Sequence, residues 1–411
     1  MTSALEGTKV DWGQFSGLCL LGFVQMTGYA IARPATESLF LEHCGANALP
    51  KVWLAVAFTA LAVTTIYNRY ASSIDLGRLF SAVAWISLGL LVVLILVAPY
   101  APTPAGFALY VWKDVYIVVL VEVFWTFANA VYRLDTARWI YGLFLASGAV
   151  GGLVGNFGVG PLARRIGTLH ALWLVVPVLA FTGVASFFAM RGVVRTNGRA
   201  PSRFGAGFAR VAKNRYLLLI MALIGVVQLV LTLIDYQFNA ALAASYPDVD
   251  VRTQVTGTIY GYISIFELCL QLSSGLVLRY AGVTAALIGT PLILGVTLLV
   301  AFVKPVFATI ASAKIASKAL DYSVMRAAKE LLYIPLPYAD KTQGKAVVDV
   351  LTYRTAKGGA SLLLLLLQGL HSVTILPIIA ALMIAWLVTA ASLAKRFRAL
   401  VRNPPGNPTD N

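Results

Sequence analysis

Segments of about 20 apolar residues recur along most of this 411-residue chain, and this repetition limits the fold more than any single motif does. An α-helix of that length crosses a bilayer core about 30 Å thick. Only 12% of the residues are charged, about half the share in soluble domains. The segments also lack the alternation of apolar and polar residues that marks the strands of a membrane β-barrel. The sequence therefore predicts an all-α polytopic membrane protein rather than a soluble enzyme.

We expect about twelve transmembrane helices in two six-helix bundles, the major-facilitator-like arrangement. The longest polar interruption, residues 191–215, carries seven Arg and Lys residues and no acidic residue. The predicted domains are an N-terminal bundle (1–190), a basic cytoplasmic linker (191–215), a C-terminal bundle (216–394) and a basic, partly disordered cytoplasmic tail (395–411). The predicted spans are 14–33, 51–68, 79–100, 108–132, 139–162, 169–190, 216–244, 255–278, 282–303, 305–325, 346–370 and 372–394.

The net charge is +15, and its distribution among the loops indicates how the chain is oriented in the membrane. Even-numbered loops and both tails hold 21 Lys and Arg residues, whereas odd-numbered loops, to which we assign Lys113 and Arg252, hold 7. Cytoplasmic loops of membrane proteins carry such an excess. We therefore expect a multi-pass protein of the inner (plasma) membrane with both termini in the cytoplasm, and no nucleic-acid partner.

Several cations lie inside the predicted spans, where an ionisable group is costly and is a functional hypothesis by default. Lys314 and Lys318 are four residues apart, and Arg354 and Lys357 are three apart, so each pair shares a helix face. Arg33, near the outer end of the first span, is a fifth candidate. Such a cluster favours an anionic ligand, and phosphate suits both Arg and Lys. The alternative is that these cations pair with nearby acids only to fix helix packing.

Acidic and aromatic residues in or near the spans provide the remaining candidates. Asp235 lies among polar neighbours and is a candidate for substrate selection or for an ion pair that opens during transport. The residues assigned to coupling or gating are Glu122, Glu267, Asp321, Lys329 and Asp349, of which Asp321 and Asp349 are also expected to form structural ion pairs. The candidates for stacking on a base are Tyr322, Tyr353 and Trp125, although aromatics in membrane helices more often serve packing.

The region from Asp321 to Gly359 resembles the bacterial and plastid ATP/ADP translocase family. The likeness is carried by Tyr322-Ser323, by the block KELLYIPL at 329–336, by 341–349 and by Lys357-Gly358-Gly359. Weaker matches occur at 29–39, 51–53, 124–129 and 243–247, so that the resemblance extends over nearly the whole chain. It implies a twelve-helix exchanger of cytosolic and external nucleotides in which positive residues neutralise phosphates.

The resemblance transfers to single residues only in part. Arg33 matches the arginine of the family's first-helix motif, whereas the lysine expected three positions later is Thr36. The acid expected in the fourth helix is Ala130, and a lysine expected before Tyr322 is Asp321. The family's acid of the seventh helix and lysines of the tenth and eleventh are present as Asp235, Lys318 and Lys357.

We therefore expect an ATP/ADP-type nucleotide antiporter, or a carrier of a related phosphorylated anion, that works by alternating access. The alternative is a major-facilitator transporter of another anionic metabolite, driven by protons through Glu122 or Glu267. The chain lacks a P-loop, an HExxH motif and a GxSxG elbow, so we expect no catalytic residue, metal site or cofactor. The expected partners are an anionic small molecule and the lipid bilayer, and the sequence does not indicate an oligomeric state.

Overall fold

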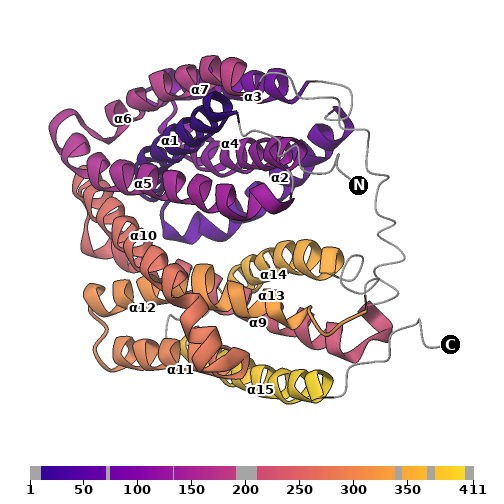
Figure 1. Ribbon diagram of the computed structural model, residues 1–411. Helices are drawn as coiled ribbons and strands as arrows, with labels where there is room; N and C mark the ends of the chain where they lie inside the picture. The colour runs from indigo at the N-terminus through magenta and orange to yellow at the C-terminus, as the bar shows by residue number, and fades with distance from the viewer. Residues whose placement is uncertain are drawn as a thin grey trace, which may run out of the picture. The chain divides into compact units, whose positions relative to one another are not determined.

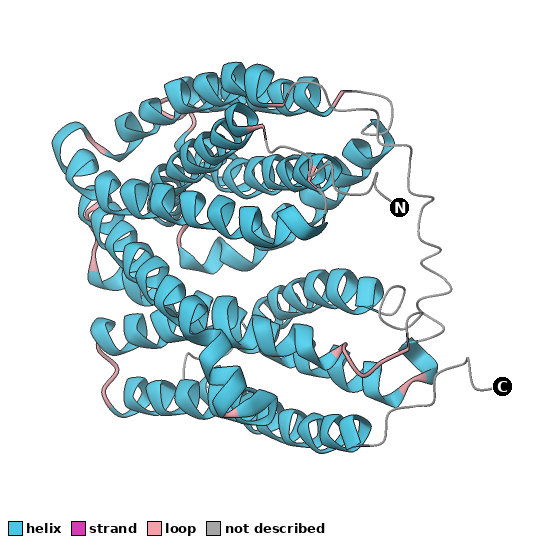
Figure 2. Cartoon of the chain, viewed as in Figure 1, coloured by secondary structure: helices cyan, strands magenta, loops and turns pink. Residues whose placement is uncertain are grey.

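The computed structural model describes residues 11–70, 75–132, 134–190, 211–337, 345–367 and 375–402. It describes the side chains of these residues except at 68–70, 134–139, 345–347, 349–351, 353, 354, 375 and 376. Within this part of the chain every regular element is a helix (Figures 1 and 2). The prediction of an all-α protein is confirmed.

The elements of the first half follow the predicted spans closely. They are α1 (Trp12–Cys44), η1 (Ala46–Ala48), α2 (Leu49–Tyr70), α3 (Leu76–Val97), α4 (Pro102–Val131), α5 (Leu134–Ile166), α6 (Thr168–Ala171), η2 (Leu172–Leu174) and α7 (Val175–Ala189). The largest difference is in α1, which continues through Pro34 to Cys44, so that Arg33 lies well inside the helix and not near its end. Membrane helices tolerate an internal proline because neighbouring groups satisfy the freed carbonyl.

The second half contains the other six spans. Its elements are α9 (Arg215–Ser245), α10 (Val249–Tyr280), α11 (Gly282–Val303), α12 (Phe307–Leu320), the π-helical turn η3 (Asp321–Met325), α13 (Arg326–Leu332), α14 (Lys345–Leu367) and α15 (Ile375–Arg402). α13 ends before Pro335 and Pro337, as expected where prolines cannot continue a helix. α15 is helical for eight residues beyond the predicted end at 394.

Nine helices in the described ranges are long and apolar enough to cross a membrane. α4 carries three charged residues, Lys113, Asp114 and Glu122, within its length. α12 is interrupted by the π-turn, and the apolar part of α14 is short, Thr355–Leu367. The helices outside the nine are therefore those in which charges or an irregular turn interrupt the apolar stretch.

The chain forms two compact units. The first contains Met1–His43, Phe58–Gly198 and Asp248–Gly261, and the second contains Cys44–Ala57, Arg199–Pro247 and Tyr262–Asn411. Both α2 and α10 therefore contribute residues to each unit. The predicted boundaries of the two bundles stay a prediction.

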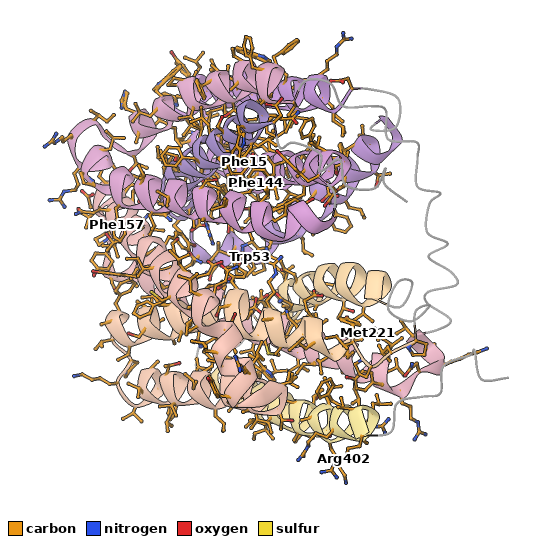
Figure 3. The ribbon with its side chains drawn as sticks, viewed as in Figure 1. Phe15, Trp53, Phe144, Phe157, Met221 and Arg402 are labelled. Carbon is orange, nitrogen blue, oxygen red and sulfur yellow. The ribbon has the colours of Figure 1, made fainter. Side chains whose placement is uncertain are left out.

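In the first unit, α3 packs against α4 and α7. The core contains fully buried side chains of α3 and α4, among them Phe80, Leu109 and Phe127. Phe15 of α1 stacks on Phe144 of α5 with ring centroids 5.7 Å apart (Figure 3). This packing fixes the positions of α1 and α4, which carry a buried group of charges.

In the second unit, α9 packs against α12, α14 and α15, and α11 packs against α12 and α15. α9 buries side chains around most of its circumference, including Leu223, Val230 and Leu233. A helix that is apolar on all sides belongs in the interior of a membrane bundle. Asp235, the single acidic residue of α9, is thus carried by a central helix.

Candidate functional site

Three charged side chains of the second unit meet at a group that we call the lysine site, Asp235, Lys314 and Lys318. Lys314 Nζ lies 2.6 Å from Asp235 Oδ1, and Lys318 Nζ lies 2.9 Å from Asp235 Oδ2. The two lysines are one turn apart on α12, so they reach the same carboxylate of α9. The predicted shared face of these lysines is confirmed, and Asp235 forms ion pairs with both.

The three members of the lysine site differ in how exposed their side chains are. Lys314 is 1% exposed and its ammonium lies 5.3 Å from the ring centroid of Phe238. The Lys318 and Asp235 side chains are 12% and 22% exposed, and Lys318 Nζ lies 5.9 Å from the ring of Tyr322. Lys314 is therefore the most deeply buried member of the site, and Lys318 and Asp235 are more exposed.

Helix α14 carries the other predicted cations next to α9. A Cβ atom built at Gly225 of α9 would lie 3.7 Å from the Thr352 methyl group of α14. Consecutive spanning helices run in opposite directions, so α9 and α14, four spans apart, run in the same direction. Lys357, five residues beyond Thr352, thus lies about 7–8 Å below the level of Asp235 along the helix axis. It is half-buried and has no ion-pair partner among the described side chains.

Three predicted residues of α14 have side chains outside the described part of the chain: Asp349, Tyr353 and Arg354. Their backbone belongs to the helix, but the contacts predicted for them are not tested. The phosphate role of Arg354, the stacking role of Tyr353 and the ion pair of Asp349 stay predictions.

The π-helical turn η3 separates the lysine site from a second ion pair. Asp321 begins this turn, is buried, and its Oδ1 lies 3.6 Å from Lys329 Nζ on α13. The expectation that Asp321 has a structural ion-pair partner is confirmed. π-turns inside α-helices occur often at functional sites, and this one lies directly after Lys318 and contains Tyr322.

The first unit contains a separate group of buried charges, the ion cluster, formed by Arg33, Glu37, Lys113, Asp114 and the phenol of Tyr260. Glu37 Oε1 accepts from Arg33 Nε and Lys113 Nζ, both at 3.3 Å, and Glu37 Oε2 accepts from the Tyr260 hydroxyl at 2.7 Å. Lys113 Nζ also lies 2.7 Å from Asp114 Oδ1. The Arg33 guanidinium carbon lies 3.8 Å from the centroid of the Tyr260 ring. The cluster thus joins α1, α4 and α10.

Sequence analysis missed most of this cluster. It counted Lys113 with an odd-numbered loop, which is wrong, because Lys113 lies inside α4, within the predicted span 108–132, and is 1% exposed. It placed the end of the first span at Arg33 and therefore overlooked Glu37. One signal was present: Glu37 follows Arg33 by four residues, the spacing of an ion pair within a helix. Arg252, also assigned to a loop, is likewise buried within α10.

The remaining candidates take no part in the ion pairs described above. Trp125 packs edge-to-face against Phe124 and Tyr141, with centroid distances of 5.5 and 5.1 Å, which is a packing environment. Glu122 is exposed on α4, and Glu267 is partly exposed on α10. Their roles in coupling stay predictions.

Comparison with known proteins identifies relatives of the whole chain. The family described as TLC ATP/ADP transporter matches residues 195–313 and 303–397. The "ADP,ATP carrier protein 1" of Chlamydia muridarum is 25% identical over 469 aligned residues, which cover 92% of this chain and 88% of that protein.

Two solved structures are similar in fold. The nucleoside transporter NupG matches with a TM-score of 0.67 and 12% identity over 95% of this chain and 99% of that one. A bacterial homologue of the iron transporter ferroportin, in its inward-facing state, matches with a TM-score of 0.70 and 12% identity over 93% and 98% of the two chains. The predicted major-facilitator-like fold is confirmed. Together with the matches in sequence, these findings show that the chain is a multi-pass membrane protein that belongs to the TLC ATP/ADP transporter family.

Proposed function

We propose that this protein exchanges nucleotides, ATP against ADP or a related phosphorylated anion, across the membrane by alternating access. The observation that carries the proposal is the lysine site, in which two ammonium groups of α12 converge on one carboxylate of α9. This arrangement occurs in a chain of the TLC ATP/ADP transporter family, whose relatives include proteins named as ADP,ATP carriers.

The chemistry of the lysine site suits a phosphate group. Asp235 offers one negative charge and two oxygens to the two ammonium groups, whereas a terminal phosphate offers up to two negative charges and three oxygens. Charge-assisted hydrogen bonds from Lys to phosphate are about twice as strong as neutral ones. A phosphate entering beside Lys318 therefore competes with Asp235 for the same donors.

This competition explains exchange rather than one-way transport. With substrate bound, phosphate takes over lysine contacts that Asp235 makes in its absence, and Lys357 and Arg354 of α14 add positive charge for the other phosphates. Without cargo, this excess of positive charge opposes movement through the low-dielectric membrane. The carrier then reorients readily only when it is loaded.

One residue is proposed to contact the nucleotide base, and one residue of the first unit is proposed to contact an anionic group of the substrate. Tyr322, which lies near Lys318, is the best-supported stacking residue, because its ring is close to the phosphate donors. Arg33 is the first unit's candidate for an anionic group, and its guanidinium plane is held against Tyr260. We place the protein in the bacterial plasma membrane with both termini in the cytoplasm, on the basis of the charge bias of the loops.

The test is uptake of labelled ADP and ATP into proteoliposomes that contain unlabelled nucleotide or are empty. The proposal expects uptake only into the preloaded vesicles. Uptake into empty vesicles that depends on a pH gradient would instead support the proton-coupled alternative. No uptake by folded protein would mean that the cargo is another anion, in line with Thr36 and Ala130 standing where the family pattern has a lysine and an acid.

A further inference from the structure

The last helix, α15, continues past the predicted end of its span at 394 and has a basic end. Its last eight residues, 395–402, contain no acidic residue and four exposed cations, Lys395, Arg396, Arg398 and Arg402. Arg402 is labelled at the end of the helix in Figure 3. At 1.5 Å per residue these eight residues add about 12 Å. The helix therefore extends from the apolar core of the bilayer into the layer of lipid headgroups.

Three of these cations continue the lipid-facing side of α15. In the spanning part of the helix, Ile384 and Val388 are 64% and 60% exposed, and large apolar side chains exposed on a spanning helix face lipid. Lys395 follows Val388 by seven residues, which is close to two turns. Arg398 and Arg402 follow Lys395 by three and seven residues, so they share its face. We call Lys395, Arg398 and Arg402 the basic stripe.

The opposite side of α15 packs inside the second unit. Met383, Trp386, Ala390 and Leu393 are buried, and α15 packs against α9 and α11. A Cβ atom built at Gly295 of α11 would lie 3.7 Å from the terminal methyl group of Met383. The basic stripe is therefore on the side of α15 that faces away from the other helices of this unit.

Neighbouring helices place more cations and an aromatic ring at the same face of the membrane. Consecutive spans reverse direction, so the start of α9 and the end of α10 lie on the same side as the end of α15. Lys213 and Arg215, at the start of α9, are exposed. At the end of α10, the Arg279 guanidinium carbon lies 5.7 Å from the ring centroid of Tyr280, which is 79% exposed. Tyr is enriched at the level of the headgroups, which agrees with this placement.

The charges of the basic stripe are not neutralised within the described part of the second unit. None of its members forms an ion pair with a described side chain there. Arg398 Nε donates to the Ala394 carbonyl of the same helix at 3.4 Å. Orientation in the membrane requires an excess of positive charge on one side only, and it does not require the charges to face lipid. Their position on the lipid-facing side thus favours an anionic ligand in the headgroup layer.

We propose that the basic stripe binds the phosphate groups of anionic phospholipids in the leaflet next to it. Lipid phosphates lie at this depth, carry the opposite charge and accept the charge-assisted hydrogen bonds that Arg and Lys donate. The long stems of these side chains lie along apolar surface while their charged ends reach the headgroups. The surface is separate from the lysine site, so the inference does not depend on the cargo.

Quenching by spin-labelled lipids tests the proposal at the stripe itself. Ala399→Cys, at an exposed position one turn after Lys395, would carry a fluorophore in nanodisc-embedded protein whose Cys19, Cys44 and Cys269 are replaced by Ser. Each Arg or Lys near an anionic surface strengthens binding about fivefold. Spin-labelled phosphatidylglycerol should therefore quench at a mole fraction at least fivefold lower than spin-labelled phosphatidylcholine. Equal quenching by the two lipids would overturn the proposal in favour of a protein partner.

Removal of charge provides the matched comparison. Replacing all three cations of the basic stripe by Gln should abolish the difference between the two lipids, as should high salt. The control removes three exposed cations at the opposite ends of spans: Arg164→Gln, Arg165→Gln and Lys304→Gln. The control should keep the preference for phosphatidylglycerol. A preference that survives in the basic-stripe variant, or that is lost in the control, would contradict the assignment.

A second measurement uses the unmodified chain. Native mass spectrometry of protein equilibrated with equal amounts of phosphatidylglycerol and phosphatidylethanolamine should show mainly phosphatidylglycerol retained. The basic-stripe variant, with an unfolding temperature in detergent like that of the wild type, should retain fewer of these lipids. Equal retention of both lipids by the wild type would also overturn the proposal. Neither measurement involves transport, so failure of the lipid site and failure of the proposed exchange are distinguished.

Discussion

The two groups of charge differ in balance. The ion cluster of the first unit contains two cations, Arg33 and Lys113, and two carboxylates, Glu37 and Asp114. The lysine site of the second unit contains two cations on one carboxylate, and its Lys318 and Asp235 are partly exposed. A cluster of balanced charge holds helices together, whereas a cluster with an excess of positive charge attracts an anion.

The two groups also differ in how they are attached. Glu37 joins three helices through three partners, which are Arg33 on its own helix, Lys113 on α4 and Tyr260 on α10. The ion pairs of the lysine site join α9 and α12, and the site lies next to the π-turn, where the helix geometry changes. We therefore propose that the first group mainly stabilises the fold and that the second binds the substrate.

The largest expected effect is on stability. Lys113→Met would leave Glu37 and Asp114 without their shared ammonium in a buried position, which costs about 3–5 kcal/mol. We expect a marked fall in the unfolding temperature of the purified protein in detergent. The matched variant Lys318→Met, at a partly exposed position whose carboxylate keeps Lys314, should lose much less. Equal losses in the two variants would remove the distinction between the groups.

The next effect is on transport. Lys318→Ala removes a charge-assisted contact to the proposed phosphate, worth about 1.5–3 kcal/mol, so ADP exchange should fall by roughly 10- to 150-fold. The unfolding temperature should stay close to that of the wild type, because Asp235 keeps Lys314. Wild-type exchange rates in this variant would contradict the assignment of the lysine site to substrate.

A smaller effect with the opposite sign is expected from Asp235→Asn. The amide no longer competes with phosphate for the lysines, so the apparent KM for ADP should fall by roughly tenfold, or about 1.4 kcal/mol, while turnover also falls because substrate leaves more slowly. Initial rates of exchange over a range of ADP concentrations separate the two quantities. A KM that rises as in Lys318→Ala would show that Asp235 contacts the substrate instead of competing with it.

A last pair of variants distinguishes the two aromatic candidates. Trp125→Phe keeps an aromatic ring against Phe124 and Tyr141 and should change the KM for ADP less than twofold. Tyr322→Ala should raise it by roughly 5- to 150-fold if the ring stacks on the base, since stacking is worth about 1–3 kcal/mol. A large effect at Trp125 with none at Tyr322 would move base recognition to the first unit.

The fold could be predicted from the sequence because the length of each apolar segment can be read from the local sequence alone. Each span could be recognised by its own composition, and even the end of α13 followed from Pro335 and Pro337. α1 was the exception, since the predicted span ended at Arg33 whereas the helix continues to Cys44. That one error concealed Glu37 and with it the centre of the ion cluster.

The lysine site could be predicted from the sequence only in part. The spacing of Lys314 and Lys318 showed that they share a face, but their convergence on Asp235 depends on the packing of α12 against α9, which no local pattern reports. Lys113 was assigned to a loop because a Lys-Asp pair near the start of a span has the same composition as a loop. Only burial distinguishes the two, and burial is a property of the folded unit.

Equilibrium binding of labelled ADP to the purified protein is the measurement that tests the account most directly. The account predicts saturable binding to the wild type that phosphate analogues displace, at least tenfold weaker binding to Lys318→Ala, and unchanged binding to Trp125→Phe. Binding to Lys318→Ala as tight as to the wild type, in protein shown to be folded, would contradict the claim that the lysine site holds the anionic substrate.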